Sequence, residues 1–335
     1  MKKFNREEFD RAKREKLLSY DIYEYNFDEM LSGFDVVRSV LSKPEVLSGK
    51  IGKYEAAVPQ RRRAWDGLTF ILNCYSGGHQ IAEIAQFFPA VLGFWESYSQ
   101  AWEVFQNSDE STNGTVATLP LLGTQFAYAN QLICLGALLG WGTHLKRMPK
   151  IIDFNNPQQD GMLERLLASY VPNRSAPPGE CTRHLPYYKT LKIFAAPKES
   201  RAVLMKEYLA DWYEASRREV YYESHKRGEI FTGYWSWESA AITFILDIDD
   251  SSYRDMMFYP IDLVDYARSV NAPRSFVEPY SESELREKSG EICPLGGVWE
   301  SLDIPPQRKR FEKGDVMQAT EAAYGITVWR YLGAS

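Results

Sequence analysis

Apolar side chains recur every three to four residues along most of the first 270 positions, which is the spacing of helices that bury one face. Between residues 5 and 41 this spacing predicts one long amphipathic helix or two joined helices. Pro59 is expected to be the first residue of its helix, and Pro89 to kink or divide its own. Gly228 suits the position just after a helix that ends at residue 226. Further helices are predicted over 59–75, 79–106, 119–146, 187–195, 198–226, 236–246 and 260–269, with a short one near 252–257.

The pattern changes near the end of the chain. The runs GGVWES, KRFEKGD and ITVWRYLG are short, aromatic and β-branched, and Gly, Pro or Asp separates them. Such runs predict two or three β-strands. The fold class is therefore mostly α, a two-domain helical protein with a small C-terminal β-element. We expect an N-terminal helical domain over 1–150, a Pro-rich connection over 151–186, a C-terminal helical domain over 187–270 and an extension over 271–335.

One apolar stretch is long enough to cross a membrane. No charged residue occurs between Ser111 and Thr143, and the segment from Leu119 to Trp141 has the length of a bilayer span. This segment contains Gln125, Asn130 and Gln131, and its flanks lack a clear basic bias. We therefore predict a helix buried in the protein core and no contact with a membrane.

Charge and cysteine content narrow the class of partner. The chain has 39 Lys and Arg against 45 Asp and Glu, a net charge of −6, which is poorly suited to gripping a nucleic-acid backbone. An acidic, aromatic-rich surface suits a basic partner better. The charged first residues are not followed by an apolar segment, and no cysteines form a C-x-x-C pair, so we expect a cytoplasmic protein with free thiols.

The sequence offers little for catalysis. It contains no G-x-S-x-G, P-loop or dinucleotide-binding pattern, and no two of its four histidines lie four residues apart on a helix. Cys74 precedes His79 by five residues, but a cysteine on the apolar face of a helix usually acts as a small hydrophobic residue. We therefore predict no catalytic residue, no cofactor and no metal.

Three clusters of charge, one acidic and two basic, leave alternatives open. Asp247, Asp249, Asp250 and Asp255 could serve a metal-dependent hydrolase together with a distant histidine, although an EF-hand would need Gly and Glu where Ser252 and Phe258 stand. Arg61, Arg62 and Arg63 could serve a helical nucleic-acid-binding regulator, as could Arg308, Lys309 and Arg310, but solvated positions at a helix start and in a hairpin explain them more simply.

A family resemblance rests on three motifs between Tyr187 and Arg268. They are a Trp-Tyr helix ending in a His-Lys pair, the run Gly-Tyr-Trp-Ser-Trp-Glu, and an Asp-Asp-Ser-Ser loop that leads to Tyr-Pro-x-Asp-Leu. Together they resemble the C-terminal domain of PoNi-type polymorphic-toxin immunity proteins. The motif residues, which we expect to be structural, are Trp212, Tyr213, His225, Lys226, Gly233, Trp235, Trp237, Glu238, Tyr259, Pro260 and Asp262.

Two flanking regions extend the resemblance. Residues 74–96 resemble the N-terminal domain of the same family, where a Tyr-Ser-x-Gly turn leads into a helix, but the usual heavily charged helix is replaced here by Ala, Phe and Pro. Residues 290–332 are similar to an extension of some bacterial immunity proteins, with Pro294, Gly297, Trp299, Phe311, Gly314, Gly325 and Trp329 as its markers.

The resemblance implies an all-helical protein without enzymatic activity. Such a protein binds a cognate nuclease toxin, typically of the restriction-endonuclease-like class, in a one-to-one complex inside the bacterium. Within the family, this chain most resembles members that neutralise type VI secretion effectors. Homo-oligomers are compatible with it. Asp247, Asp249, Asp250 and Asp255 would then offer carboxylates to the basic residues that hold DNA, with Tyr253 as an aromatic anchor beside them.

Overall fold

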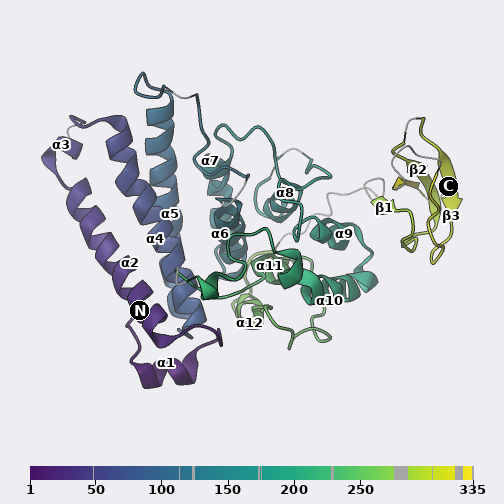
Figure 1. Cartoon of the computed structure of the whole chain (residues 1–335), viewed down its shortest axis with the longest axis horizontal. Helices are drawn as coiled ribbons and strands as arrows, with labels where there is room; N and C mark the ends of the chain where they lie inside the picture. The colour runs from purple at the N-terminus through teal and green to yellow at the C-terminus, as the bar shows by residue number, and fades with distance from the viewer. Residues whose placement is uncertain are drawn as a thin grey trace.

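The helices of the first third form one layer. The computed structural model describes residues 1–47, 49–112, 114–122, 125–172, 174, 176–227, 230–274, 286–303, 305–320 and 327–333. Figure 1 shows α2 (Tyr20–Leu41), α4 (Lys53–Ser76) and α5 (Ile81–Gln106) side by side, with α1 (Arg6–Ala12) beside the N-terminal end of α2 and the short α3 (Pro44–Leu47) between α2 and α4. Of the two arrangements predicted for residues 5–41, one long helix or two joined helices, the structure has two helices. Each has its own side-chain cap, Asn5 for α1 and Ser19 for α2.

Two prolines lie inside these helices. The prediction that Pro59 begins its helix is wrong, because α4 starts six residues earlier, at Lys53. Pro89 does not divide its helix, since α5 runs without interruption from Ile81 to Gln106. Proline has no N–H, so the carbonyl of Ala85 lacks its usual donor four residues later. The indole Nε1 of Trp141 donates to that carbonyl at 2.6 Å.

A second group of helices surrounds α6 (Phe126–Leu138). The predicted helix over 119–146 is shorter than expected, because a 3-10 helix, η2 (Gly142–Arg147), follows α6 after a turn. Eleven of the 13 residues of α6 are buried, and α6 packs against α11 (Trp237–Ile245). Among the described residues, no helix is both long and apolar enough to span a membrane. The remaining members are α7 (Pro149–Ile152), α8 (Gly161–Ala168), α9 (Lys189–Ala195), α10 (Lys198–Ala215), η3 (Ser224–Lys226) and α12 (Ile261–Ser269).

Two helix predictions in this group are wrong, one in where the helix ends and one in that a helix forms. The long helix over 198–226 ends at Ala215, and turns connect it to η3. Residues 252–257 form turns instead of a short helix. Gly228, expected after that long helix, and Gly325 in the tail lie outside the described residues.

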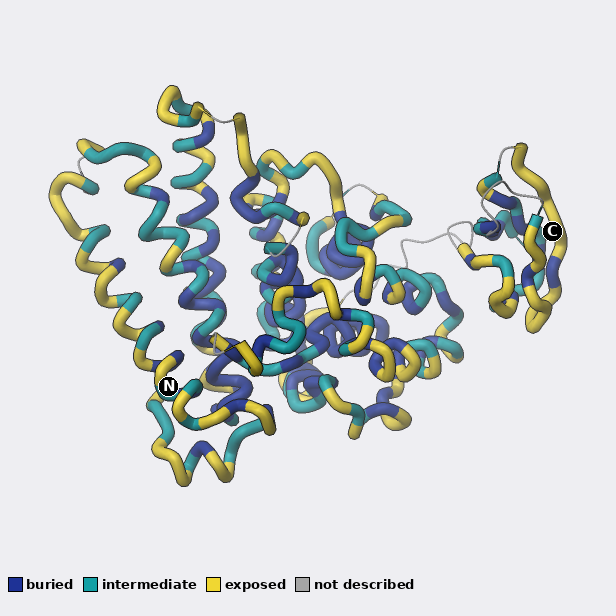
Figure 2. The backbone as a smooth tube through the Cα atoms, in the orientation of Figure 1, coloured by how far each residue is buried: buried dark blue, intermediate teal, exposed yellow. Residues whose placement is uncertain are grey.

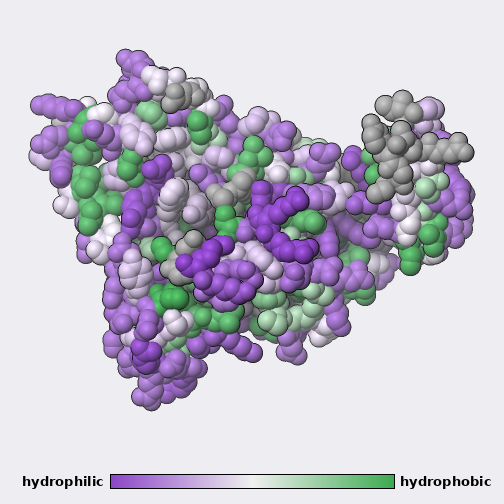
Figure 3. All heavy atoms as spheres, in the orientation of Figure 1, coloured by the Kyte–Doolittle hydropathy of each residue, from purple (hydrophilic) through white to green (hydrophobic). Residues whose placement is uncertain are grey.

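One hydrophobic core joins both helical groups. It extends from Phe9 to Ala272, and Figure 2 shows buried segments running through both groups. Figure 3 shows one face of the molecule, where hydrophilic residues predominate and hydrophobic ones gather in small groups. Every residue of α11 is buried, and this helix contributes Trp237, Ile242 and Phe244 to the core.

The C-terminal residues form a small antiparallel sheet in the order β1-β4-β2-β3, set apart from the helices in Figure 1. Its strands are β1 (Arg286–Lys288), β2 (Gly297–Ser301), β3 (Arg308–Phe311) and β4 (Val328–Gly333), one more than the two or three predicted. The sheet has a separate core, made of Cys293, Trp299, Phe311, Met317, Trp329 and Tyr331. The predicted fold class, mostly α with a small C-terminal β-element, is confirmed.

Candidate functional site

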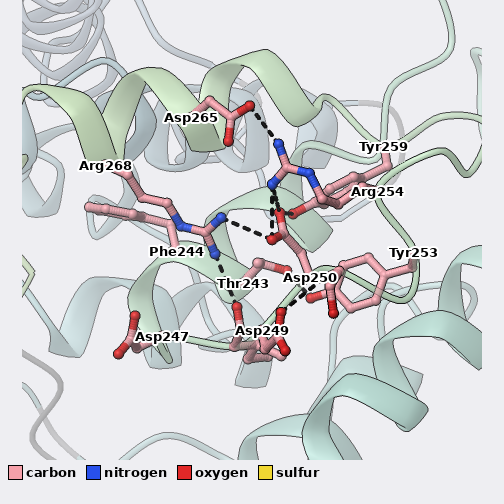
Figure 4. Close-up of polar contacts among 12 residues, drawn as sticks. Thr243, Phe244, Asp247, Asp249, Asp250, Tyr253, Arg254, Tyr259, Asp265 and Arg268 are labelled. Carbon is pink, nitrogen blue, oxygen red and sulfur yellow. Dashed lines mark hydrogen bonds and ion pairs between the residues drawn. The ribbon is translucent and has the colours of Figure 1, made fainter.

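The acidic loop lies between α11 and α12, and its central carboxylate is buried. Asp250 is 4% exposed. Its oxygens accept hydrogen bonds from Arg254 at 3.0 Å, from the Tyr259 hydroxyl at 3.0 Å and from Arg268 at 2.9 Å (Figure 4). Arg254 also pairs with Asp265. Asp250 therefore holds the loop to α12 and is not free to contact a partner in this conformation.

The electrostatic state of Asp250 follows from these contacts. Burial by itself raises the pKa of a carboxyl group, but hydrogen bonds from Arg268, Tyr259 and Arg254, with the charge of Arg268, outweigh it. The pKa of Asp250 is consequently lowered. A carboxylate enclosed by two guanidinium groups is a poor ligand for a metal cation.

Tyr253, the predicted aromatic anchor, also points inward. It is 1% exposed, and its hydroxyl lies 2.9 Å from the hydroxyl of Thr243 on α11. Its ring packs edge-on against Tyr259, with centroids 5.2 Å apart. Burial is the main reason that the pKa of Tyr253 is raised. In this conformation Tyr253 stabilises the loop from inside.

The other three predicted aspartates are on the surface. Asp247, Asp249 and Asp255 are exposed. Asp247 has a left-handed backbone with φ of 52° and forms an ion pair with Arg274, while Asp249 accepts a hydrogen bond from the backbone of Ser251. Met257 in the same loop is 74% exposed. The accessible part of the loop thus presents three carboxylates and one thioether side chain, together with the exposed Ser251 and Ser252.

The family-motif residues converge on a second buried carboxylate, Glu238. It is 1% exposed and lies in the first turn of α11. Its Oε1 accepts hydrogen bonds from Trp212 Nε1 at 2.6 Å and from the Tyr208 hydroxyl at 2.7 Å. The Ser236 hydroxyl also donates to Oε1, at 2.7 Å, and Asn130 Nδ2 donates to Oε2 at 3.0 Å. We call this set, Asn130, Tyr208, Trp212, Ser236 and Glu238, the Glu238 cluster.

The Glu238 cluster joins three helices that are far apart in the sequence. Trp212 and Tyr208 come from α10, Asn130 from α6 and Glu238 from α11. All of its members are at most 3% exposed. Four hydrogen bonds and the positive end of α11 offset the cost of removing the carboxylate from water. The motif glutamate is therefore a structural centre of the second helical group.

Other motif residues hold the segment before α11 in place. Trp235 Nε1 donates to Ser76 Oγ at 2.8 Å, which joins this segment to α4. Gly233 has φ of 95°, and a Cβ atom there would lie 2.5 Å from Trp235 Nε1, so only glycine fits. Among the other motif residues, His225 Nδ1 lies beside the Tyr234 hydroxyl, and Lys226 forms an ion pair with Glu223. Asp262 forms an ion pair with Arg14, and the ring of Tyr213 stacks on that of Phe258. Trp237 and Pro260 are buried.

The candidates for catalysis are engaged in packing. Cys74 is fully buried, and burial raises its pKa. His79 is 1% exposed, its Nε2 lies 2.8 Å from the Tyr23 hydroxyl, and its ring stacks on Phe4. Within the described ranges, no group of three or more His, Cys, Asp and Glu side chains is placed to hold a metal ion.

The basic triplet is also engaged. Arg62 forms ion pairs with Asp66 at 2.5 Å and with Glu29 at 2.9 Å. Arg61 lies over the ring of Trp65, and Arg63 over the ring of Phe94. In the tail, Arg308 pairs with Glu300. These contacts give both basic triplets partners within the chain, which favours the solvated structural interpretation over a nucleic-acid surface.

Sequence reasoning did not identify the partners of Glu238. In the sequence, Asn130 stands out only as a polar residue that argues against a membrane span, and no pattern marks Tyr208 as a partner of Glu238. The useful signal was local: Ser236 and Glu238 stand at the start of a helix whose other residues are apolar. A carboxylate in that position must be buried with its helix, so it needs several donors.

Comparison with known proteins agrees with this picture. Residues 158–263 match the family described as PoNe immunity proteins (PoNi), C-terminal, and the match contains Glu238, the acidic loop and the start of α12. No curated protein matches the chain. The chain is similar in fold to the crystal structure of protein PA2201 from Pseudomonas aeruginosa, with a TM-score of 0.60 and 20% identity over 78% of this chain and 93% of that one. Residues 158–263 are thus similar to the C-terminal domain of PoNe immunity proteins, and over this segment the predicted resemblance to PoNi-type immunity proteins is confirmed.

Proposed function

We propose that this chain binds and neutralises a cognate antibacterial nuclease toxin, a type VI secretion effector, in a one-to-one complex in the cytoplasm. It does so without enzymatic activity, cofactor or metal. The observation that carries this proposal is the match of residues 158–263 to the C-terminal domain of PoNe immunity proteins. The net charge of −6 supports it, because a nuclease presents basic residues to its DNA substrate.

The accessible part of the acidic loop is the proposed toxin-binding surface. The residues proposed to contact the toxin are Asp247, Asp249, Asp255 and Met257, all of which are exposed. The buried contacts of Asp250 and Tyr253 give this loop a fixed shape, so little conformational entropy is lost on binding. Exposed carboxylates mainly steer association, whereas an apolar side chain that becomes buried mainly slows dissociation. Met257 therefore replaces Tyr253 as the proposed anchor.

The experiment uses the full chain and the cognate nuclease toxin. Light scattering after size exclusion should show a complex of one chain with one toxin. Changing Asp247, Asp249 and Asp255 together to Asn should lower the association rate about tenfold at low salt, and less at 0.5 M salt, because screening already weakens steering there. Asparagine tolerates the left-handed backbone of residue 247, so the fold should survive.

A matched control changes the same net charge elsewhere. Glu199, Glu207 and Glu214 on α10 are exposed, and replacing all three with Gln alters the charge equally. If this control slows association as much as the loop variant, general charge and not the loop attracts the toxin. If the chain forms no complex with the toxin and does not protect cells against it, the proposed function itself is wrong.

A further inference from the structure

A small cavity lies beside Glu238 in the second helical group. Its volume is about 50 Å³, and its lining includes Asn130, Gln131, Trp212, Trp235 and Glu238. Gln131, Thr232, Gly233 and Trp235 are half-buried, so this side of the cavity reaches the surface. A water molecule needs about 10–15 Å³ of such volume. The cavity therefore has room for a few non-hydrogen atoms.

The charge in this cavity is not balanced by a neighbouring cation. Glu238 is the sole charged residue among the described residues that line it. Its four hydrogen-bond donors, in Asn130, Tyr208, Trp212 and Ser236, are all neutral. This differs from Asp250, which faces two guanidinium groups. A carboxylate held only by neutral donors keeps its negative field, and low-dielectric walls strengthen that field.

Two oxygen atoms at the cavity have capacity to accept more hydrogen bonds. Oε1 of Glu238 accepts three hydrogen bonds, whereas Oε2 accepts one, from Asn130. Each carboxylate oxygen carries two lone pairs, so the three donors at Oε1 share its lone pairs, whereas Oε2 has one lone pair left for a further donor. The Oε1 atom of Gln131 is buried and has no hydrogen-bond partner among the described residues. A ligand that donates several hydrogen bonds would satisfy both oxygens.

Five aromatic rings supply much of the remaining lining, beside Leu72, Ala127, Thr232 and Gly233. These rings belong to Tyr187, Trp212, Tyr221, Trp235 and Trp237. The faces of such rings attract cations, most strongly when water is excluded. A carboxylate, a free amide oxygen and indole rings around a space of this size form a receptor for a small organic cation.

We propose that this cavity binds a primary ammonium group. Its three N–H donors match the available acceptors, with one for Glu238 Oε2, one for Gln131 Oε1 and one directed at a ring face or a water molecule. The positive charge offsets that of the buried carboxylate, and the first methylene groups of its alkyl chain contact the indoles. A lysine side chain of the toxin and a free alkylamine share this chemistry.

The first experiment titrates the full chain with methylammonium chloride and follows tryptophan fluorescence, because three tryptophans line the cavity. Sodium chloride at the same ionic strength is the reference. We expect a saturable change with methylammonium and none with tetraethylammonium, whose nine non-hydrogen atoms exceed the space. A response identical to that of sodium chloride would show that the cavity holds only water, and would overturn the proposal.

Variants locate the binding. Glu238→Gln keeps the shape but removes the charge, and should weaken methylammonium binding at least about tenfold. Glu219→Gln is the matched control, since Glu219 is also buried but pairs with Arg183 and does not line the cavity. If Glu238→Gln fails to fold, Gln131→Leu tests the same cavity from its half-buried side and should also weaken binding. Unchanged affinity in every folded cavity variant would place the cation elsewhere.

A second arm identifies the source of the ammonium group, and this arm alone rests on the proposed function. If Nα-acetyl-lysine amide competes with methylammonium for the cavity, the opening admits a lysine side chain. If methylammonium also weakens toxin binding, that lysine belongs to the toxin. Methylammonium binding without such competition assigns the cavity to a free amine. If the toxin does not bind at all, the proposed function fails while the titration still decides the cavity.

Discussion

The two buried carboxylates at opposite ends of α11 are satisfied in different ways. Glu238 lies in the first turn of this helix, and Asp250 follows its last residue by five positions. Both are at most 4% exposed. Asp250 is bound by two arginines and a tyrosine, whereas Glu238 is bound by four neutral groups.

The direction of the helix explains this difference. The amide dipoles give α11 a positive N-terminal end, which stabilises a carboxylate such as Glu238 without a cation nearby. The C-terminal end is negative, so Asp250 near that end needs positive side chains to be stable. Asp250 is consequently neutralised within the chain, while Glu238 retains a charge that a ligand can use.

The largest expected change in stability comes from removing Glu238, the carboxylate whose hydrogen-bond donors are all neutral. Glu238→Ala leaves the donors of Asn130, Tyr208, Trp212 and Ser236 without an acceptor, and each unpaired buried group costs about 1–3 kcal/mol. We expect the free energy of unfolding to fall by about 4 kcal/mol or more, measured by urea denaturation. Glu207→Ala, at an exposed position of α10, should change it by less than about 0.5 kcal/mol. A loss below about 1 kcal/mol for Glu238→Ala would show that the cluster is not a structural centre.

The protonation of His79 also changes the free energy of unfolding at acid pH, so it must be known before the two carboxylates are compared there. Burial, and then the charges of the N-terminus and Arg14, lower its pKa from 6.5 to about 4. The unfolded chain therefore binds a proton between these values that the folded chain does not, so stability falls as pH drops from 6.5 to 4. The loss reaches about 3 kcal/mol.

Urea denaturation at pH 7, 5.5 and 4 measures this loss. His79→Gln removes the titrating group, so its stability should depend less on pH across the same range. A histidine resonance of residue 79 that titrates near 6.5 in the folded protein would contradict the prediction.

A smaller effect is expected for the carboxylate that pairs with arginines. Asp250→Asn should lower the free energy of unfolding by about 2 kcal/mol, because the arginines are partly exposed and water compensates in part. The pKa of Asp250 is lowered in the folded state, so its contribution exists above the ordinary value of 3.8 and is lost as pH falls below it.

Salt distinguishes the two carboxylates most clearly. In 1 M NaCl the effect of Asp250→Asn should shrink, since salt screens partly exposed charges, while that of Glu238→Ala should not. Asp255→Asn, at an exposed position of the same loop, is the control and should have almost no effect on stability at either salt concentration. Equal salt dependence for both carboxylates would mean that the proposed distinction is wrong.

The helices were predictable because their signal is local. Apolar spacing located α2, α5, α9, α11 and α12 closely, and aromatic runs located β2, β3 and β4. Pro59 misled the prediction because a helix that packs on two neighbours tolerates a proline in its second turn. The turns at 252–257 follow from the burial of Tyr253 and Tyr259, which the sequence spacing does not reveal.

The site was less predictable because its contacts are distant in the sequence. Asn130 and Glu238 are separated by 108 positions, and no local pattern joins them. The acidic composition of residues 247–255 was visible, but which carboxylates face outward depends on Arg268, from the following helix. Asp247, Asp249 and Asp255 as contacts of a toxin, and the division into domains, remain predictions.

The proline within α5 has a consequence for how this protein can change over time. Ala85 has a carbonyl without a partner in its own helix, and the indole of Trp141 donates to it. Replacing Pro89 alone would give that carbonyl a second donor, whereas replacing Trp141 alone would leave it without one. Each substitution therefore alters the effect of the other, so the two positions form an epistatic pair. Homologous chains should gain or lose this proline and this tryptophan together, which couples the sequence of one helical group to that of the other.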